Sequence, residues 1–439
     1  MAGKIDIVLL GATGYTGRLC AAYMTKTIPD TISWAIAGRN RGKLEDLQKE
    51  LKEKGATCLS SPFSPDPPSM LITTGTVYAL DLNSDTAIAE LAQTARVIIN
   101  TIGPYSATCG TAVIKACAEN GTDYVDCSGE MPWMQGIIAN YDETARRSGS
   151  RIVMTAGWGA VPADLPTYLA VRHIREEMSL PTREVLVSLD DLRGSFSGGS
   201  INSMCDLEMS YGSARIAAAS APFALSPVPR SSAEISKRGV LPSPNVFGVQ
   251  VVEGMGALVE GSQTGIETGI IGRSWGLFAG QESYSLGPDG YGKNFFFSSR
   301  VRQSGPIMAW MFRAGFILLT TAITKIPPLR NLATKTLFPP GTGPSEEQRR
   351  GNHFTYRVVA IPDQEETSRR VEVKFAYQGD PYVFTGVSLT EAALALLEGG
   401  TPAHQRGGIL TSAMLGDRFV ERLKRPQAGV EIEIKVVEE

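Results

Sequence analysis

Short apolar runs alternate with amphipathic segments over the first 160 residues. The runs are rich in Val and Ile and bounded by turn residues, which is typical of buried strands, whereas the segments between them repeat apolar residues at helical spacing. The predicted strands are Ile5–Leu10, Ser33–Ala37, Val77–Leu80, Arg96–Thr101, Tyr124–Asp126 and Ile152–Thr155, and the predicted helices are Arg18–Thr27, Gly42–Lys54, Thr111–Asn120 and Ile137–Ser148. This alternation predicts an α/β fold with a doubly wound parallel sheet, the Rossmann fold.

The pattern changes after Pro162, where helical spacing becomes rarer and glycines more frequent. The predicted strands here are Val185–Leu189, Val246–Val252, Phe354–Ile361, Val371–Tyr377 and Tyr382–Val387. Gln378–Pro381 has the composition of a turn and predicts an antiparallel hairpin between the last two strands. We therefore expect a second, mixed α/β domain.

The C-terminal residues return to helical spacing. Thr390–Leu397 and Thr411–Leu423 predict helices, and the alternation from Val430 to Val436 predicts a half-buried final strand. The predicted division is a Rossmann domain over residues 1–160, a second domain for substrate binding or oligomerisation over 161–389, and a C-terminal part over 390–439 that could pack back on the Rossmann domain.

Two segments depart from this alternation. Ser60–Ser69 contains four prolines, which cannot continue a helix, and predicts a surface loop without a functional role. Ile307–Ile326 is almost wholly apolar except for Arg313 and Lys325. It is interpreted as a buried or oligomer-facing helix, with peripheral contact to lipid as an alternative; a central Arg argues against a membrane span, because it costs roughly 2.5 kcal/mol or more to insert.

Composition narrows the functional classes. The chain has 439 residues, and its 42 Lys and Arg nearly balance 45 Asp and Glu, which gives no basic surface for nucleic acid. The six cysteines form no C-x-x-C pair and only three histidines are present, so neither a zinc cluster nor a disulfide scaffold is expected. The N-terminal apolar run leads directly into a glycine loop, which fits a strand better than a signal peptide. A soluble protein in the cytoplasm, with membrane or lipid association left open, is the resulting expectation.

A glycine-rich loop follows the first predicted strand and opens the first helix. The sequence Gly11-Ala12-Thr13-Gly14-Tyr15-Thr16-Gly17 has the spacing G-x-x-G-x-x-G, a variant of the dinucleotide fingerprint in the context which that fingerprint requires. Gly11 permits the tight turn, Gly14 permits close approach of the pyrophosphate, and Gly17 permits packing of the helix on the strand. We expect Gly11, Thr13, Gly14, Tyr15, Thr16 and Gly17 to bind the cofactor.

The end of the second strand indicates which cofactor. NAD-binding folds place an acidic residue there for the ribose 2′-OH, whereas this chain has Arg39 in Ala37-Gly38-Arg39-Asn40-Arg41. A guanidinium can pair with a 2′-phosphate, so NADPH is predicted to bind much more tightly than NADH. Asp81, at the end of the third strand, could face the adenine or serve a turn.

Further loops follow the later strands, at the edge of the sheet where ligands bind in open α/β folds. Asn100, Gly103 and Pro104 are predicted to border the cofactor, and Tyr105 and Glu130 are predicted to be catalytic. Tyr105 could donate a proton and Glu130 could hold a polar group of the substrate or of the nicotinamide, although packing and helix capping are comparable roles. Asp164, in the loop after the sixth strand, is interpreted mainly as a first-turn acid of the next helix.

These motifs, in this order, resemble the saccharopine dehydrogenase-like oxidoreductases, a group that includes the trans-acting enoyl reductases. The resemblance also rests on Tyr124–Glu130, Ser197–Ser200 and Gly407–Ala413. The last of these segments, together with the Gly416 that follows it, is similar to a C-terminal helix of the family. It implies a Rossmann domain, a mixed second domain, NADPH, and reduction of a C=C or C=N bond. The chain departs from the family at Gly157–Ala160, where Gly-Phe-Asp-Ser is common, and at Ser412, where Pro is usual.

The leading hypothesis is therefore an NADPH-dependent reductase of a lipid, polyketide or other secondary metabolite, with a small-molecule substrate held between domains. A Tyr-x-x-x-Lys pair is absent from the sequence, which disfavours ketone reduction by the short-chain dehydrogenase mechanism. The alternatives are a non-catalytic NADPH-binding protein at a lipid surface or in a complex, and saccharopine chemistry, for which Arg193, Arg230, Arg273, Arg300 and Arg302 form no recognisable motif. A homo-oligomer is compatible with each hypothesis.

Overall fold

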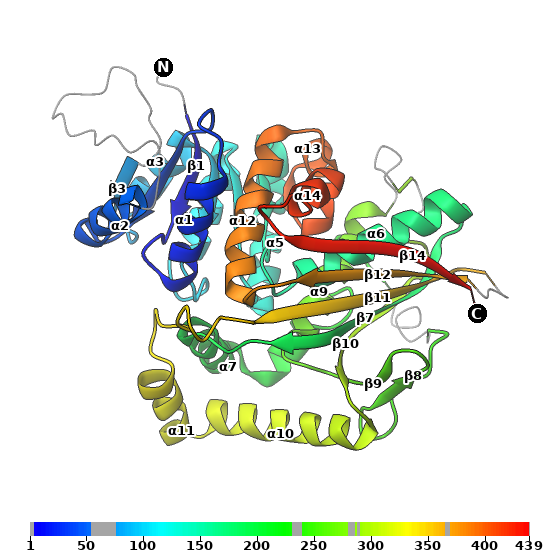
Figure 1. Cartoon of the computed structure of the whole chain (residues 1–439). Helices are drawn as coiled ribbons and strands as arrows, with labels where there is room; N and C mark the ends of the chain where they lie inside the picture. The colour runs from blue at the N-terminus through cyan, green and yellow to red at the C-terminus, as the bar shows by residue number, and fades with distance from the viewer. Residues whose placement is uncertain are drawn as a thin grey trace. The chain divides into compact units, whose positions relative to one another are not determined.

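Two compact units make up the chain. The computed structural model describes residues 4–53, 76–230, 239–279, 286–287, 290–364 and 369–438, so that the proline-rich stretch Ser60–Ser69 lies outside the described residues. Unit 1 comprises Met1–Trp158 and Tyr382–Ala428, and unit 2 comprises Gly159–Pro381 and Gly429–Glu439. Each unit is built on one seven-stranded sheet (Figure 1).

The sheet of unit 1 is parallel throughout, which confirms the predicted Rossmann fold. Its strands are β1 (Ile5–Leu10), β2 (Trp34–Gly38), β3 (Thr76–Ala79), β4 (Ala95–Asn100), β5 (Asp123–Asp126), β6 (Arg151–Val153) and β13 (Gly408–Leu410). Their order is β13-β6-β5-β4-β1-β2-β3, so the direction of winding reverses between β1 and β4. Ligands of open parallel sheets bind at this switch point, beyond the carboxyl ends of the strands.

The helices of unit 1 pack on its sheet and on one another. They are α1 (Tyr15–Thr27), α2 (Arg41–Glu53), α3 (Asp85–Thr94), α4 (Gly110–Asn120), α5 (Met131–Ser148), α12 (Pro381–Glu398), α13 (Pro402–Arg406) and α14 (Gly416–Leu423), with a 3-10 turn over Ser412–Leu415. The sequence analysis did not identify α3. It also assigned residues 407–413 to a helix, whereas Gly408–Leu410 pair with Arg151–Val153 and extend the sheet as β13.

The predicted strand Tyr382–Val387 and its hairpin are wrong, because these residues begin α12. The aromatic and β-branched side chains that favoured a strand belong to a helix that is buried on most sides. Such a helix has apolar residues all round, so its sequence shows no simple helical period. Pro381 occupies the first helical position, where its missing N–H costs no hydrogen bond. The predicted domain boundary at 389/390 falls inside this helix. The helices of the predicted C-terminal part belong to unit 1, and its final strand belongs to unit 2.

Unit 2 has a mixed sheet in the order β14-β12-β11-β7-β10-β9-β8. The strands are β7 (Thr182–Arg193), β8 (Gln250–Val252), β9 (Gly256–Val259), β10 (Phe296–Gln303), β11 (His353–Pro362), β12 (Arg369–Tyr377) and β14 (Val430–Glu438). Among the described strands of this sheet, β7 and β10 pair in parallel and the other pairs are antiparallel. Val246–Gly248, predicted as part of a strand, precedes β8 as a turn.

The helices of unit 2 are α6 (Val161–Met178), α7 (Gly198–Ala219), α9 (Thr264–Phe278), α10 (Pro306–Lys325) and α11 (Pro327–Asn331), followed by a π-helical turn, η1 (Leu332–Leu337). In the core, α6 packs on β11 and β12, and Tyr168, Phe278 and Tyr291 form a stack. Asp164 lies in the first turn of α6 as predicted, and its Oδ1 accepts a 2.5 Å hydrogen bond from Ser274.

The apolar segment 307–326 forms α10, and the interpretation as a helix buried in the core is wrong. Ala309 is the one residue of α10 that is buried within unit 2. Among the described residues, α10 is also the one helix long and apolar enough to cross a membrane by length and composition. Figure 1 shows it as a straight helix on the outside of unit 2, beside β9 and leading into α11.

Candidate functional site

The glycine loop between β1 and α1 has the geometry of a phosphate-binding turn. Gly11 has φ +86°, which side chains rarely adopt, and a Cβ on Gly17 would lie 2.2 Å from the carbonyl oxygen of Gly11. The backbone angle at Gly11 and the close approach at Gly17 explain why these two positions are glycines. Gly14 is the N-cap of α1, and no side chain caps the helix there. The N–H groups of Thr16 and Gly17 lie in the first turn of the helix, where they lack intrahelical partners and favour an anion.

The glycine loop lies against the loop that follows β4. A Cβ on Gly11 would come within 2.8 Å of both Ile102 Cγ1 and Thr101 Oγ1. Thr101 donates both its N–H and its hydroxyl to the carbonyl of Leu10, which fixes the two loops together. The predicted residues Gly11–Gly17, Gly103 and Pro104 therefore share one edge of the sheet at the switch point, and Thr13, Tyr15, Thr16 and Pro104 are half-exposed along it.

Arg39 follows β2 directly and is exposed at this edge. Within the described ranges, no hydrogen bond or ion pair is found for its guanidinium. Burial raises the pKa of the thiol of Cys109, which precedes α4, and the charge of Arg39 opposes this shift, so Arg39 lies within electrostatic range of that thiol. Asn40 next to it caps α2 by accepting the N–H of Lys43 at 3.0 Å. An exposed cation after β2 has the position needed to meet a 2′-phosphate.

Asp81 has the turn role that the sequence left open. Its Oδ1 accepts the N–H of Asn83 at 2.9 Å, and its carbonyl accepts the N–H of Ser84, the N-cap of α3. The carboxylate is exposed, so this bond does not shield it from solvent.

Asn100, predicted to border the cofactor, points into the protein. It is fully buried at the end of β4, donates to the hydroxyl of Tyr124 at 3.1 Å and accepts the N–H of Ile102 at 3.0 Å. Tyr124 in turn donates to Asp126, whose other oxygen accepts hydrogen bonds from Ser128 and Thr155. Burial raises the pKa of Asp126 to about 6, opposed by those hydrogen bonds. This network holds the carboxyl ends of β4, β5 and β6 together.

Tyr105 and Glu130 lie close together, but neither faces an open surface. The Tyr105 hydroxyl donates to the carbonyl of Asn100 at 3.0 Å and lies 3.3 Å from Cys127 Sγ, and its ring stacks on Trp133. Burial raises the pKa of Tyr105 well above its ordinary value. Glu130 is 3% exposed, and its two oxygens accept the N–H groups of Tyr105 at 2.6 Å and Ser106 at 2.8 Å. The geometry gives no support to proton donation by Tyr105, because its hydroxyl is buried.

The sequence analysis missed the contribution of α12 to this edge of unit 1. Thr385 accepts the N–H of Trp158 at 3.2 Å, and a Cβ on Gly157 would lie within 3.0 Å of both Thr385 Cγ2 and Cys127 Cβ. Ser388 donates to the carbonyl of Ala156 at 2.7 Å. The length of the apolar run 381–398 could have revealed it, because buried strands seldom exceed eight residues.

The same helix packs on α1 next to the glycine loop. Tyr15 and Tyr382 meet edge to face with ring centroids 5.5 Å apart, and Tyr23 donates to Glu391 at 2.6 Å. Gly386 allows close approach, since a Cβ there would lie 2.9 Å from the backbone nitrogen of Cys20. The C-terminal segment thus completes unit 1 beside the candidate cofactor site. The departure from the family pattern at Ser412 is buried within this segment.

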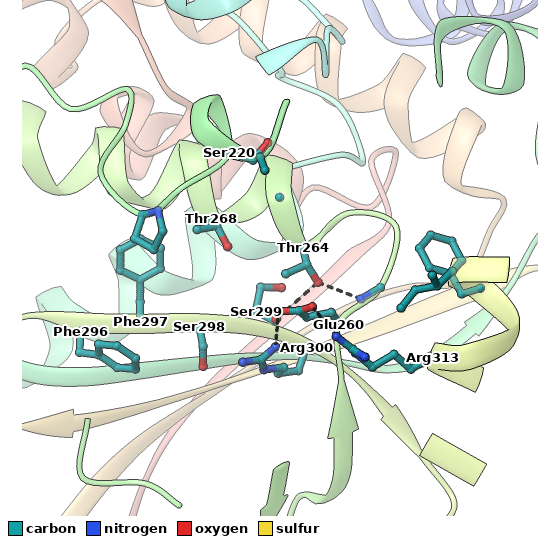
Figure 2. Close-up of a pocket in the computed structure, with 16 residues that line it drawn as sticks. Ser220, Glu260, Thr264, Thr268, Phe296, Phe297, Ser298, Ser299, Arg300 and Arg313 are labelled. Carbon is teal, nitrogen blue, oxygen red and sulfur yellow. Dashed lines mark hydrogen bonds and ion pairs between the residues drawn. The ribbon is translucent and has the colours of Figure 1, made fainter. Parts of the chain in front are cut away.

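Unit 2 contains a cavity of about 510 Å³ between α7, α9, β10 and α10. Figure 2 shows Phe296 and Phe297 at one side of it and Arg300, Arg313 and Glu260 at the other. Glu260 pairs with Arg300 at 3.1 Å and with Arg313 at 3.8 Å, so two cations share one carboxylate. Of the arginines that the sequence offered as substrate ligands, Arg300 lines this cavity. No group of side chains suited to a metal ion is found among the described residues.

Comparisons with known proteins agree with this geometry. Residues 7–153 match the family model described as the saccharopine dehydrogenase NADP binding domain. The chain is 29% identical to a trans-acting enoyl reductase of Mycobacterium tuberculosis (strain H37Rv), with 97% of each chain covered. It is 28% identical to a trans-acting enoyl reductase of Mycobacterium ulcerans, again with 97% of each covered.

A solved structure shows the same fold. Saccharopine dehydrogenase (L-Glu forming) from Saccharomyces cerevisiae, in its apo form, superposes with a TM-score of 0.54 over 99% of this chain and 100% of the other, at 12% identity. The resemblance inferred from the motifs is confirmed, as are the oxidoreductase class and the NADP(H) cofactor. The chain is an NADP-dependent oxidoreductase that is similar to the saccharopine dehydrogenase-like proteins, and its residues 7–153 match the NADP-binding domain of that family.

Proposed function

We propose that this chain reduces the C=C bond of an α,β-unsaturated acyl chain belonging to a lipid, a polyketide or a related secondary metabolite, at the expense of NADPH. The observation that carries this proposal is the likeness to trans-acting enoyl reductases over 97% of both chains, which includes unit 2 as well as the NADP-binding domain. The yeast saccharopine dehydrogenase supports the fold but not the choice of substrate, at 12% identity.

The residues of unit 1 suit the cofactor. Gly11, Thr13, Gly14, Tyr15, Thr16 and Gly17 would surround the pyrophosphate at the start of α1, and Arg39 would meet the 2′-phosphate. The edge formed by Thr101–Pro104 and Cys127–Glu130 would then lie beside the nicotinamide, which supplies the hydride when NADPH is bound. The overall reaction consumes NADPH, one proton and the unsaturated chain, and yields NADP⁺ and the saturated chain.

Glu130 and Tyr105 act on this edge as positioning residues in our proposal. The Glu130 carboxylate holds two successive N–H groups of the loop after β4, and Tyr105 ties the same loop to the end of that strand. A loop held from two sides keeps its backbone fixed beside the cofactor, and such orientation is the main contribution a protein makes to hydride transfer.

Oxidation of NADPH in the presence of defined acceptors tests the proposed reaction. We expect turnover with an α,β-unsaturated acyl thioester and none with a cyclic imine or a simple ketone. Turnover with the imine alone would move the reaction to C=N reduction. If no acceptor supports oxidation although NADPH binds, the non-catalytic alternative is favoured.

The same assay separates the two roles of Tyr105. Tyr105→Phe removes a hydroxyl that donates to Asn100, so we expect turnover within roughly threefold of the wild type, whereas loss of a proton donor costs about 10²-fold or more. Retained turnover would show that the Tyr105 hydroxyl is not the proton donor. A loss of about 10²-fold with unchanged folding and NADPH affinity would restore Tyr105 as the proton donor.

The cofactor preference is tested at Arg39. Arg39→Ala is expected to weaken NADPH binding by about 10- to 100-fold, the value of charge-assisted hydrogen bonds, and to leave NADH affinity unchanged. Titration of both cofactors by fluorescence measures the two affinities. Lys43→Ala is the matched control, because it removes a nearby cation that lies in the first turn of α2. Equal loss for both cofactors in Arg39→Ala would contradict the assignment.

A further inference from the structure

The outward face of α10 is an exposed apolar surface. Eight of its large apolar side chains are exposed, and they define what we call the α10 face: Ile307, Met308, Trp310, Met311, Phe312, Ile317, Leu318 and Leu319. Ile307 and Leu318 are 75% and 72% exposed. The surface continues into α11 and η1, where Leu329, Leu332 and Leu337 are exposed. Water-exposed apolar area of this extent on one segment indicates an interaction site.

The inner side of α10 is a narrow stripe that includes its one central charge. Ala309 is buried, and Phe316, Thr320 and residues 322–324 are half-buried. Arg313 belongs to the same stripe, pairs with Glu260 and lies against Gly248, whose Cβ would meet Arg313 Nε at 2.7 Å. The α10 face therefore contains no charged residue, and the central Arg that argues against a membrane span does not oppose contact of this face with lipid.

The charged residues within the segment 306–338 have one sign. Residues 306–338 contain four cations, Arg313, Lys325, Arg330 and Lys335, and neither Asp nor Glu, although the whole chain carries a formal charge of −3. Lys325, Arg330 and Lys335 follow the apolar face toward its C-terminal end. Basic residues beside an apolar helix are attracted to anionic lipid headgroups by about 1 kcal/mol each.

Both ends of α10 are tied to the body of unit 2. At the N-terminal end, Ala309 is buried with Val249, Ala257 and Val259. At the other end, Lys325 pairs with Glu208 of α7, and beyond η1 the side chain of Asn202 donates to the carbonyl of Phe338 at 3.0 Å. A helix crossing a bilayer would carry one end to the other side of the membrane. Attachment of both ends to one folded unit therefore argues against a span, and a helix that contacts lipid in this state would lie in the plane of the surface.

We propose that α10, together with α11 and η1, docks unit 2 in plane on an anionic lipid bilayer. The apolar side chains of the α10 face would enter the boundary between headgroups and acyl chains, where Trp is also favoured, and Arg330 and Lys335 would lie at headgroup level. The occupant is lipid rather than a second copy of the chain because the segment has cations without acids. Two copies meeting through it would bring like charges together.

Co-sedimentation of the full chain with vesicles tests the proposal. We expect binding to vesicles of phosphatidylcholine mixed with phosphatidylserine, weaker binding to phosphatidylcholine alone, and release of the bound protein by alkaline carbonate, as for a helix that does not span. Replacing Lys335 by Gln is expected to lower the partition coefficient on the mixed vesicles about fivefold, with little effect on pure phosphatidylcholine. Lys424→Gln, at an exposed cation of unit 1, is the control and should not change it.

The apolar contribution is tested by Leu318→Asp combined with Leu319→Asp. Both side chains are exposed, so the variant should fold, and we expect at least ~10²-fold weaker vesicle binding because two leucines no longer enter the bilayer. Ile434→Asp on β14, at the opposite edge of the sheet from β9 and α10, is the matched control.

Three results would overturn the proposal. The first is absence of binding to the mixed vesicles by a folded wild-type chain. The second is retention in the membrane pellet after carbonate washing, which would indicate a span. The third is a dimer in analytical ultracentrifugation that the Leu318→Asp and Leu319→Asp variant dissociates, with no vesicle binding, which would assign the α10 face to a second copy.

Discussion

Replacing Gly17 by Ala is expected to abolish NADPH binding at micromolar cofactor and to destabilise unit 1. The new Cβ would lie 2.2 Å from the Gly11 carbonyl oxygen and 2.9 Å from Ala12 Cα, both of which are backbone atoms. The glycine loop and α1 must therefore move apart, and overpacking of this kind costs roughly 1–3 kcal/mol or more. Loss of two charge-assisted hydrogen bonds to the pyrophosphate would weaken binding by at least ~10²-fold.

Gly136→Ala is the matched control. Gly136 lies in α5 of the same unit, and a Cβ there would meet nothing within 4 Å. By helix propensity alone both substitutions should stabilise, by up to about 1 kcal/mol. We expect this gain at Gly136 only. Thermal unfolding with and without saturating NADPH measures both effects, because bound cofactor raises the midpoint of the wild type and of Gly136→Ala but not of Gly17→Ala. An equal cofactor-induced rise in all three proteins would disprove the close approach at Gly17.

The elements that were predicted well from the sequence are those whose structure is determined by residues close to them in the chain. The run Ile5–Leu10 is predicted with its observed bounds because buried parallel strands are short, apolar and followed at once by a glycine turn. The cofactor class follows from the same local context, since Arg39 directly follows β2.

The C-terminal segment shows where local pattern is insufficient. Residues 382–387 have aromatic and β-branched side chains that favour a strand, yet burial on most sides makes them part of α12. Gly408–Leu410 are too few to be recognised as a strand without knowledge that the edge of β6 lies beside them. Contacts made hundreds of residues apart in sequence, such as that of Thr385 with Trp158, decided both outcomes.

Side-chain direction at the site was also beyond the sequence. Asn100 ends β4 and Tyr105 follows that strand, but position at a strand end does not specify which way a side chain points. Both turn inward because buried groups need hydrogen-bond partners: Asn100 bonds with Tyr124, and Tyr105 supplies a donor to the carbonyl of Asn100. Glu130 was predicted from the sequence to contact the substrate or the nicotinamide, whereas in the structure its carboxylate accepts hydrogen bonds from two backbone N–H groups.

A second large effect is expected at Glu267 of α9, which lies beneath the cavity of unit 2. The side chain is fully buried and bonds with the hydroxyls of Ser299 and Tyr356. Ser299 lines the cavity. Burial raises the pKa of Glu267 to about 7, against the two hydroxyl hydrogen bonds, which favour the charged form. A carboxyl with a raised pKa is held in its protonated form by the folded chain up to about neutral pH.

The sign of the resulting pH dependence follows from proton binding. Between the ordinary pKa of 4.5 and about 7, the folded chain keeps the Glu267 proton and the unfolded chain releases it. The stabilisation that Glu267 contributes is therefore fully present below the ordinary pKa of 4.5, and it decreases as the pH rises to the raised pKa of about 7. The decrease in the free energy of unfolding is roughly 3 kcal/mol across this window, because one pKa unit corresponds to about 1.4 kcal/mol.

Glu267→Gln should remove this pH dependence. The amide has the size of the protonated carboxyl, can donate to Ser299 and can accept from Tyr356, but it cannot ionise. We expect wild type and variant to be equally stable near pH 4.5 and the variant to be more stable by roughly 3 kcal/mol above about pH 7. Urea unfolding, followed by hydrogen–deuterium pulse labelling of peptides from β10 and β11, reports on unit 2 specifically.

Glu253→Gln, at an exposed carboxyl of the same unit, is the control for loss of one negative charge and should leave the difference between wild type and variant near zero at every pH. Asp123 and Asp126 of unit 1 also have pKa values raised to about 6, so the whole chain retains some loss of stability with rising pH when Glu267 is replaced. Peptides of β10 and β11 exclude that contribution. A stability gap between Glu267→Gln and wild type that stays constant from about pH 4.5 to about pH 8 would show that the side chain does not titrate in this window, and a gap of opposite sign would show that it is ionised in the folded chain.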